Sequence, residues 1–152
     1  MAFRVIRSAS ASWSGTVPEG GGRLALGSGA FEGPFTLRAR VEEGQPGANP
    51  EELIGAGHAG CFTMSLASLL SDEGHPPDDL QTTARVVLEQ TETGFTITRI
   101  DLETVGSVAG VDEATFVRLA EQAKATCPVS RALAGTEIAL TARLESNRRE
   151  AS

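Results

Sequence analysis

The chain has 152 residues, close to the ~150 of one domain, so we expect a single domain over residues 1–152 with a solvated tail over residues 147–152. Apolar residues make up 40% of the chain and 17 glycines accompany them, a composition that excludes disordered and fibrous proteins. The formal net charge of −7 argues against partners that carry phosphate, both nucleic acids and anionic membrane surfaces.

The N-terminal segment, residues 1–7, mixes apolar and basic residues and has no apolar stretch followed by a cleavage site, so we expect no signal peptide. The longest apolar run, residues 53–70, contains His58 and several glycines and hydroxyl residues. We interpret it as a buried helix and not as a membrane anchor, which favours a cytoplasmic protein without membrane partners. In a reducing cytosol, two cysteines are expected to cycle their thiols and not to form a permanent disulfide.

The first third of the chain predicts an antiparallel meander. Three segments, residues 3–13, 23–26 and 35–41, combine β-branched, aromatic and small polar residues and are separated by glycine-rich turns.

The next segment predicts a long helix over residues 50–73. Asn49 supplies an N-cap acceptor, Pro50 occupies the first helical position, and two carboxylates follow in the first turn. Residues 53–70 are apolar or small almost all round, so we expect this helix to be enclosed on most sides. Each glycine costs a helix roughly 1 kcal/mol relative to alanine, which predicts close approach of another backbone. The glycines are Gly55, Gly57 and Gly60.

The remaining pattern predicts a hairpin over residues 80–92 and 95–105, a second helix from residue 112 to residue 126, a short helical turn over residues 129–133, and a last strand over residues 136–144. This order indicates an α+β fold in which helices pack on antiparallel strands. One subunit has few layers with which to cover an apolar central helix. We therefore expect a homodimer with both central helices in a shared core.

The two cysteines, Cys61 and Cys127, lie 66 positions apart, which excludes a CxxC motif and a four-cysteine metal cage. Cys61 falls on the predicted buried helix, where many cysteines are simply small core residues. Cys127 precedes Pro128 and is predicted to be the N-cap of the short helical turn. Free backbone amides at that position would stabilise a thiolate.

Two remote thiols of this kind suit a thiol peroxidase, in which one thiolate is oxidised by a peroxide and the second condenses with it to a disulfide. The attacking thiol needs a nearby cation because burial otherwise raises its pKa. Arg38 and Arg40 are the candidates, and two residues apart on a strand they would point to the same face.

Two motifs carry a family resemblance. The segment Asn-Pro-Glu-Glu-Leu-Ile-Gly-Ala-Gly-His-Ala-Gly-Cys-Phe over residues 49–62, together with Cys-Pro-Val-Ser over residues 127–130, resembles the OsmC/Ohr family of osmotically inducible and organic hydroperoxide resistance proteins. The resemblance covers essentially the whole chain. The His-Ala-Gly-Cys form is more similar to the OsmC branch than to the Ohr branch.

This resemblance implies an intertwined homodimer that acts on organic hydroperoxides and more weakly on hydrogen peroxide. It implies a peroxidatic cysteine at Cys61, a resolving cysteine at Cys127, and a glutamate at Glu51. The accompanying arginine is Arg40 when the sequences are aligned from the strand side, with Arg38 as the alternative. An external dithiol, such as a lipoylated protein, is the implied reductant, and no metal, flavin or haem is required.

Helix geometry adds a constraint to this site. Glu51 and Cys61 are ten residues apart, which in one straight helix is ~15 Å along the axis and ~80° around it. Either the helix breaks around residues 55–57, or Glu51 and Arg40 reach Cys61 of a second subunit. We favour the second alternative, which predicts composite active sites at the dimer interface.

A non-catalytic dimer is the alternative function. His58 lies three residues before Cys61 on the same helical face, where it could tune the thiol, begin a metal site, or be a packed, hydrogen-bonded core histidine, which we favour. A metal-binding module would use His58, Cys61 and Cys127, with His75 as a further ligand. A silent ligand-binding dimer would use both cysteines only for packing.

Overall fold

A computed structural model describes residues 2–145, in two compact units with the boundary between Leu53 and Ile54. The prediction of one domain over residues 1–152 stays a prediction, and the predicted tail over residues 147–152 lies outside the described residues.

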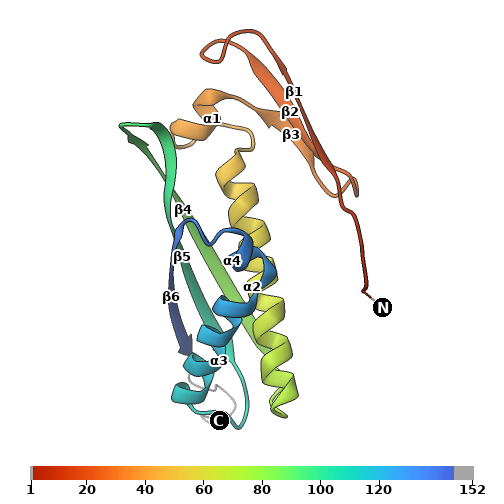
Figure 1. Ribbon diagram of the computed structural model, residues 1–152, viewed down its shortest axis with the longest axis vertical. Coiled ribbons are helices and arrows are strands. Elements are labelled where there is room, and N and C mark those ends of the chain that lie inside the picture. The colour runs from red at the N-terminus through yellow and green to blue at the C-terminus, as the bar shows by residue number, and fades with distance from the viewer. Residues whose placement is uncertain (1, 146–152) are drawn as a thin grey trace. The chain divides into compact units, whose positions relative to one another are not determined.

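The first unit is built on a three-stranded antiparallel sheet in the order β1-β2-β3 (Figure 1). Its elements are β1 (Ala9–Ser14), β2 (Gly21–Leu26), β3 (Glu32–Phe35), α1 (Leu37–Val41) and the first turn of α2 (Pro50–Asp72). The antiparallel meander is therefore confirmed for its first two strands, although β1 begins at Ala9 and residues 3–8 lie outside it. The third strand is displaced toward the N-terminus: β3 ends at Phe35, where the sequence pattern predicts the strand to begin.

The strand predicted over residues 35–41 is wrong, because residues 37–41 form the short helix α1. The hydroxyl of Thr36 caps this helix by accepting a hydrogen bond from the backbone N–H of Ala39 at 3.0 Å. Five residues are too few to separate a strand period from a helix period. Arg38 and Arg40 consequently lie ~200° apart around a helix and do not share a strand face.

The second unit contains α2 beyond Leu53, the sheet β4-β5-β6 and two helices between β5 and β6. The bounds are β4 (Asp79–Thr91), β5 (Gly94–Ser107), α3 (Glu113–Thr126), α4 (Pro128–Ala132) and β6 (Glu137–Leu144). The hairpin β4–β5 is antiparallel as predicted, but β6 pairs parallel to β5. The prediction of antiparallel strands fails there because the crossover through α3 and α4 returns the chain in the same direction.

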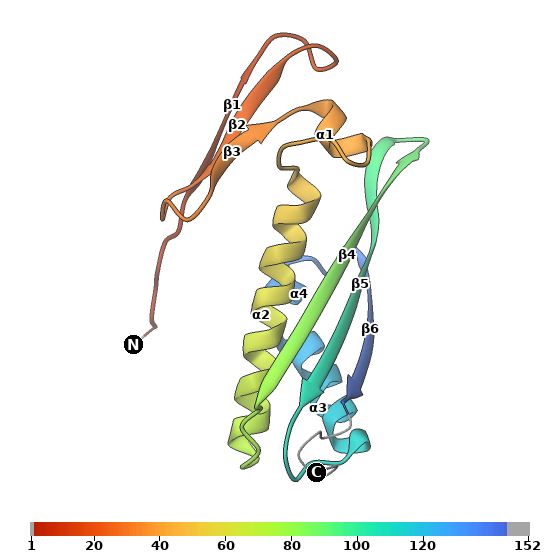
Figure 2. The ribbon, with the colours of Figure 1, turned by 180° about the vertical axis from the view of Figure 1, so that it is seen from behind.

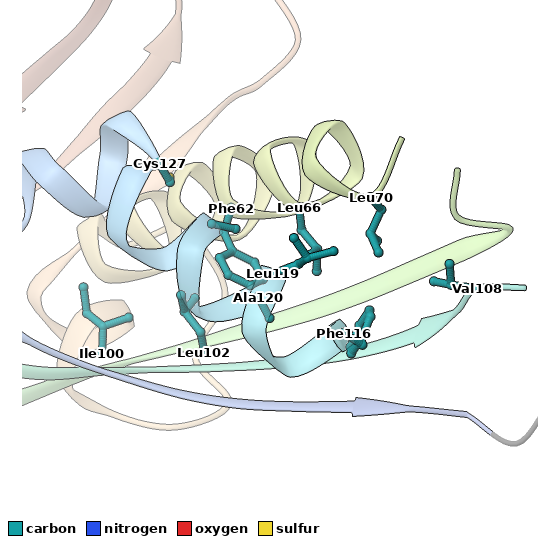
Figure 3. Packing of buried hydrophobic residues seen from close by; sticks show 11 residues of the cluster. Phe62, Leu66, Leu70, Ile100, Leu102, Val108, Phe116, Leu119, Ala120 and Cys127 are labelled. Carbon is teal, nitrogen blue, oxygen red and sulfur yellow. The ribbon is translucent and has the colours of Figure 1, made fainter. Parts of the chain in front are cut away.

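The core lies between this sheet and the helices α2 and α3 (Figure 2). Four-residue spacing along α2 turns Phe62, Leu66 and Leu70 toward it, each fully buried. The sheet contributes Ile100 and Leu102, and Figure 3 shows them facing the helical residues. The core cluster also contains Val108, Phe116, Leu119, Ala120, Ala123 and Cys127.

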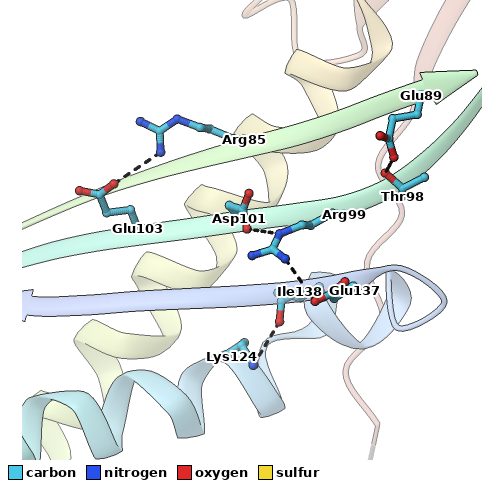
Figure 4. Close-up of polar contacts among 9 residues, drawn as sticks. All are labelled: Arg85, Glu89, Thr98, Arg99, Asp101, Glu103, Lys124, Glu137 and Ile138. Carbon is cyan, nitrogen blue, oxygen red and sulfur yellow. Dashed lines mark hydrogen bonds and ion pairs between the residues drawn. The ribbon is translucent and has the colours of Figure 1, made fainter.

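Charged and hydroxyl side chains project from β4, β5 and β6 and pair across the strands (Figure 4). Arg85 pairs with Glu103 at 3.4 Å, and Arg99 bridges Asp101 at 2.5 Å and Glu137 at 3.3 Å. Exposed pairs of this kind contribute about 0–1 kcal/mol each. They mark a solvated side of the sheet and contribute little to stability.

One face of α2 is exposed, so within one chain the predicted enclosure of this helix is incomplete. Met64 is 75% exposed, in line with Ala56, Gly60 and Ser68 at four-residue spacing. The helix α2 is long and apolar enough to cross a membrane by length and composition alone. The core helix of a soluble protein meets the same two criteria.

Two of the three helical glycines lie on this open face. A Cβ added at Gly55 would touch the backbone oxygen of Ala84 at 3.5 Å, the close approach predicted for these glycines. A Cβ added at Gly57 or Gly60 would meet nothing within 4 Å in the described chain.

Replacement of Gly106 tests the packing of β5 against α3. A Cβ there would lie 2.6 Å from the ring of Phe116, which is fully buried. Gly106→Ala should therefore lower the free energy of unfolding by about 1–3 kcal/mol, measured by urea denaturation. Gly135→Ala is the matched control, because a Cβ at that position meets nothing within 4 Å. Equal stability of the two variants would contradict this packing.

Candidate functional site

The structure brings the two cysteines together, although 66 positions separate them in the sequence. Cys61 lies on α2 and is partly buried, whereas Cys127 is fully buried between α3 and α4. Both are free thiols, and each shifts the pKa of the other, so the two sulfurs are neighbours. The second unit therefore contains two neighbouring thiols, one partly and one fully buried.

The backbone around Cys127 explains its position. Its N–H donates to the carbonyl of Ala123 at 2.9 Å and closes α3, and Pro128 then begins α4. With φ −56° and ψ 126°, Cys127 is outside the helical region, as expected before a proline. The prediction that Cys127 is the N-cap of the short helix is confirmed, although its side chain makes no regular cap hydrogen bond.

The surroundings shift the pKa values of the two thiols in opposite directions. Burial, reinforced by the contact with Cys127, raises the pKa of the Cys61 thiol. Burial would also raise the pKa of the Cys127 thiol, but the neighbouring Cys61 thiol, the backbone and hydroxyl of Ser130, and the Val129 backbone favour the thiolate, outweigh burial and lower that pKa. Within one described chain, these surroundings therefore favour the thiolate more at Cys127 than at Cys61.

His58 forms a second buried contact in this region. It is fully buried on α2, and its Nε2 lies 2.7 Å from the Ser130 Oγ on α4. Its Nδ1 is buried with no hydrogen-bond partner, and burial lowers the pKa of the imidazole. The interpretation of His58 as a packed, hydrogen-bonded histidine is confirmed, with Ser130 as its partner.

Arg40 and Glu51 form a close ion pair in the first unit. The guanidinium donates from Nη2 to the Glu51 Oε1 at 2.6 Å and from Nε to both carboxylate oxygens at 3.0 and 3.1 Å. The Glu51 side chain is 10% exposed and that of Arg40 is 34% exposed. This geometry holds the guanidinium in one orientation, with one edge occupied by the carboxylate.

The local fold explains why Arg40 and not Arg38 takes this partner. Asn49 accepts a hydrogen bond from the Glu52 N–H at 2.8 Å, which confirms it as the N-cap of α2 and fixes Glu51 in the first turn. Arg38 projects elsewhere from α1 and pairs with Glu42 at 3.2 Å in solvent. The ambiguity between the two arginines is therefore resolved in favour of Arg40 as the partner of Glu51.

An apolar cavity of about 210 Å³ lies beside this ion pair. The rings of Trp13 and Phe35 form one wall, with centroids 5.2 Å apart, and they pack over Gly22, which pairs with both residues across the sheet. A Cβ at Gly22 would lie 2.6 Å from the Phe35 ring. The cavity is lined by Trp13, Val17, Phe35, Thr36, Leu37, Arg40 and Pro50. It offers an apolar surface next to a guanidinium.

The metal-site alternative finds no support in residues 2–145, where no group of three or more His, Cys, Asp and Glu side chains is placed to hold a metal ion. The predicted cluster of His58, Cys61 and Cys127 is not such a group, with or without His75.

Each pair of predicted site residues lies together within its own unit, Cys61 beside Cys127 and Arg40 paired with Glu51. The sequence reasoning missed Ser130 and the cavity wall. Ser130 belongs to the Cys-Pro-Val-Ser motif, but its partner is 72 residues away and gives no local signal. Trp13 and Phe35 meet only through the strand register.

The sequence is similar to one protein family and to named members of it. The family described as OsmC-like protein matches residues 42–142. The chain is 42% identical over 137 residues to peroxiredoxin OsmC of Escherichia coli, covering 90% of this chain and 94% of that protein. It is 26% identical over 115 residues to the organic hydroperoxide resistance protein OhrB of Bacillus subtilis, covering 75% and 82% of the two chains.

Solved structures share the fold. An organic hydroperoxide resistance protein from Elizabethkingia anophelis superimposes with a TM-score of 0.71 at 25% identity, covering 94% of this chain and all of that one. The α+β architecture and the greater similarity to OsmC than to Ohr proteins agree with the resemblance found in the sequence.

The ion pair can be tested by removing each arginine of α1 in turn. Arg40→Ala leaves the nearly buried Glu51 carboxylate without its partner and should cost about 2 kcal/mol of stability. Arg38→Ala removes only an exposed pair and should cost less than about 0.5 kcal/mol. The single tryptophan, Trp13, lies in this unit, so its fluorescence in urea reports unfolding there. A loss at Arg38 as large as that at Arg40 would contradict the assignment.

Proposed function

Because the chain belongs to the OsmC family, in which the relatives compared above are named a peroxiredoxin and an organic hydroperoxide resistance protein, we propose that it is a thiol-dependent peroxidase. It reduces organic hydroperoxides, and hydrogen peroxide more weakly. The observation that carries this proposal is that Cys61 and Cys127 are neighbours whose thiols shift each other's pKa.

The first step oxidises Cys61. Its thiolate attacks the distal oxygen of the hydroperoxide, the O–O bond breaks, and the departing alkoxide takes a proton and leaves as the alcohol. Cys61 becomes a sulfenic acid. Arg40, held by Glu51, favours the thiolate and stabilises the charge that develops on the departing oxygen.

The second step restores the reduced enzyme in two stages. Cys127 condenses with the Cys61 sulfenic acid, which releases water and forms a disulfide. An external dithiol, with a lipoylated protein as the candidate, then reopens the disulfide by exchange. This cycle needs a reducing compartment, in keeping with a cytoplasmic protein.

The cavity beside Arg40 supports an organic substrate. Its lining includes the rings of Trp13 and Phe35 together with Arg40. An alkyl or aryl group would bury apolar surface there while its peroxide oxygens reach the cation. Hydrogen peroxide has no apolar group to bury, which accounts for the weaker activity proposed for it.

A shared site in a homodimer reconciles the two parts. The helix α2 is continuous from Pro50 to Asp72, so the alternative in which it breaks around residues 55–57 is excluded. Ten residues of unbroken helix separate Glu51 from Cys61. The exposed face of α2, with Gly57, Gly60 and Met64, suits close packing against the same helix of a second subunit. Arg40 of one subunit then serves Cys61 of the other.

The pKa shifts supply a physical reason for this arrangement. Within one chain, burial raises the pKa of the Cys61 thiol, which disfavours the attacking thiolate. A guanidinium brought to Cys61 by the second subunit would favour the anion on Cys61 and reverse that preference. Attack on peroxide would therefore depend on dimerisation.

Replacement of Cys127 tests the two-thiol cycle. Cys127→Ser should allow a single turnover with one equivalent of an organic hydroperoxide and then accumulate oxidised Cys61, because no second thiol can form the disulfide. Wild type should lose both free thiols and gain a Cys61–Cys127 link. Mass spectrometry after thiol alkylation distinguishes these products. Sustained turnover by Cys127→Ser, or retention of both wild-type thiols, would contradict the proposal and favour a silent ligand-binding dimer.

Mixed dimers test the shared site. Cys61→Ser and Arg40→Ala homodimers should both have low activity, whereas a heterodimer of the two contains one intact site and should recover about half of the wild-type activity. Peroxide consumption is measured on heterodimers purified with two different affinity tags. The absence of recovery in verified heterodimers would exclude the shared geometry.

A further inference from the structure

The contact between His58 and Ser130 has no role in the cycle proposed above. His58 is fully buried and Ser130 is 5% exposed, and their side chains meet at 2.7 Å between the His58 Nε2 and the Ser130 Oγ. The other ring nitrogen, Nδ1, is also buried and has no hydrogen-bond partner. A polar contact this deep in a small core requires a physical explanation.

The unpartnered nitrogen identifies the tautomer of His58. Burial lowers the pKa of the imidazole, so the ring is neutral and carries one hydrogen. A hydrogen on Nδ1 would be a buried donor without an acceptor, and such orphaned N–H groups are rare because they are costly. That cost favours the tautomer with its hydrogen on Nε2, in which His58 donates to the Ser130 hydroxyl.

The direction of this bond determines what the Ser130 hydroxyl can do. Its oxygen accepts from His58, so its single hydrogen remains free to donate. The Ser130 hydroxyl and its backbone N–H both act on the Cys127 sulfur and lower the pKa of that thiol. The other groups that act through hydrogen bonds on Cys127 are the Cys61 thiol and the Val129 backbone. Ser130, three residues after Cys127 on α4, thus contacts His58 through its oxygen and has its own hydrogen available for the neighbouring sulfur.

We propose that His58 and Ser130 are positioning residues for the Cys127 thiolate. His58 orients the Ser130 hydroxyl, and the hydroxyl stabilises the sulfur as the anion that attacks oxidised Cys61. The inference rests on the proposed function, because it concerns the resolving step of that cycle.

The resolving step balances as follows. The Cys127 thiolate attacks the sulfur of the Cys61 sulfenic acid, the S–S bond forms, and the S–O bond breaks. Cys127 is oxidised and the sulfenic sulfur is reduced, while the departing hydroxide takes a proton from solvent and becomes water. After Cys61 is oxidised, it can no longer donate its thiol hydrogen to Cys127. The Ser130 hydroxyl then remains as a side-chain donor to the thiolate.

Ser130→Ala removes that donor, and the pH profile of disulfide formation reports the effect. One equivalent of tert-butyl hydroperoxide is mixed with reduced protein, the reaction is quenched in acid, and mass spectrometry counts sulfenic and disulfide forms over time. Loss of the donor should raise the midpoint of the resolving step by about one pH unit. A thiolate of higher pKa is more nucleophilic, so the rate should fall about threefold below the midpoint and rise about threefold well above it.

Conservative variants separate this role from a structural one. Ser130→Thr keeps the hydroxyl and His58→Gln keeps a donor near the Nε2 position, so both should restore the wild-type midpoint. His58→Phe keeps a ring of similar size without a donor and should shift the midpoint in the same direction as Ser130→Ala. A purely structural role would slow the step by the same factor at every pH, and that result would overturn the inference.

The tautomer gives a test on the wild-type protein that requires no substitution in the network. The chain has only two histidines, and His75→Gln assigns their ring signals in ¹⁵N NMR spectra. Reduced protein should show neutral His58 with its hydrogen on Nε2 above pH 7. A hydrogen on Nδ1, or an imidazolium, would overturn the inference.

The outcomes distinguish the two proposals. If wild type forms no Cys61–Cys127 disulfide with the hydroperoxide, the proposed function fails and the resolving role fails with it. If the disulfide forms but Ser130→Ala keeps the wild-type midpoint, the inference about His58 and Ser130 alone is overturned.

Discussion

The interaction between the neighbouring Cys61 and Cys127 sulfurs is the one on which the candidate site depends. It joins the middle of α2 to the junction between α3 and α4, and the packed core of the second unit holds both positions. Within this contact, burial opposes charge on either sulfur, but the donors around Cys127 make the anion less costly there. Within the pair, the anion is therefore favoured at Cys127 and the proton at Cys61.

This asymmetry divides the proposed chemistry between the two units of the chain. The second unit supplies the two sulfurs and the donors that stabilise a thiolate at Cys127, whereas the first supplies an oriented guanidinium at Arg40 beside an apolar cavity. Under the proposed function, peroxide reduction needs a thiolate on Cys61, which the Arg40 guanidinium favours. Disulfide formation needs a thiolate on Cys127. The negative charge therefore lies on Cys61 in the first step and on Cys127 in the second, while the two sulfurs keep their positions.

Local sequence signals predicted much of the fold. Asn49 and Pro50 located the start of α2, and the proline after Cys127 predicted the junction of α3 and α4. Two errors have physical causes. The segment containing Arg38 and Arg40 is too short for periodicity to separate helix from strand, and the parallel pairing of β6 depends on a crossover that strand patterns do not encode. The candidate thiols and the pair Arg40–Glu51 were predictable from motifs, whereas Ser130 was not, because its contact with His58 exists only in three dimensions.

The coupling between the two sulfurs can be measured directly from thiolate absorbance near 240 nm as reduced protein is titrated with base. The account predicts that Cys61→Ala raises the pKa of the remaining Cys127, because a donor is lost, and that Cys127→Ala lowers the pKa of the remaining Cys61. If the two single-cysteine proteins titrate at the same pH values as the two thiols of wild type, the sulfurs do not interact and the central claim is contradicted.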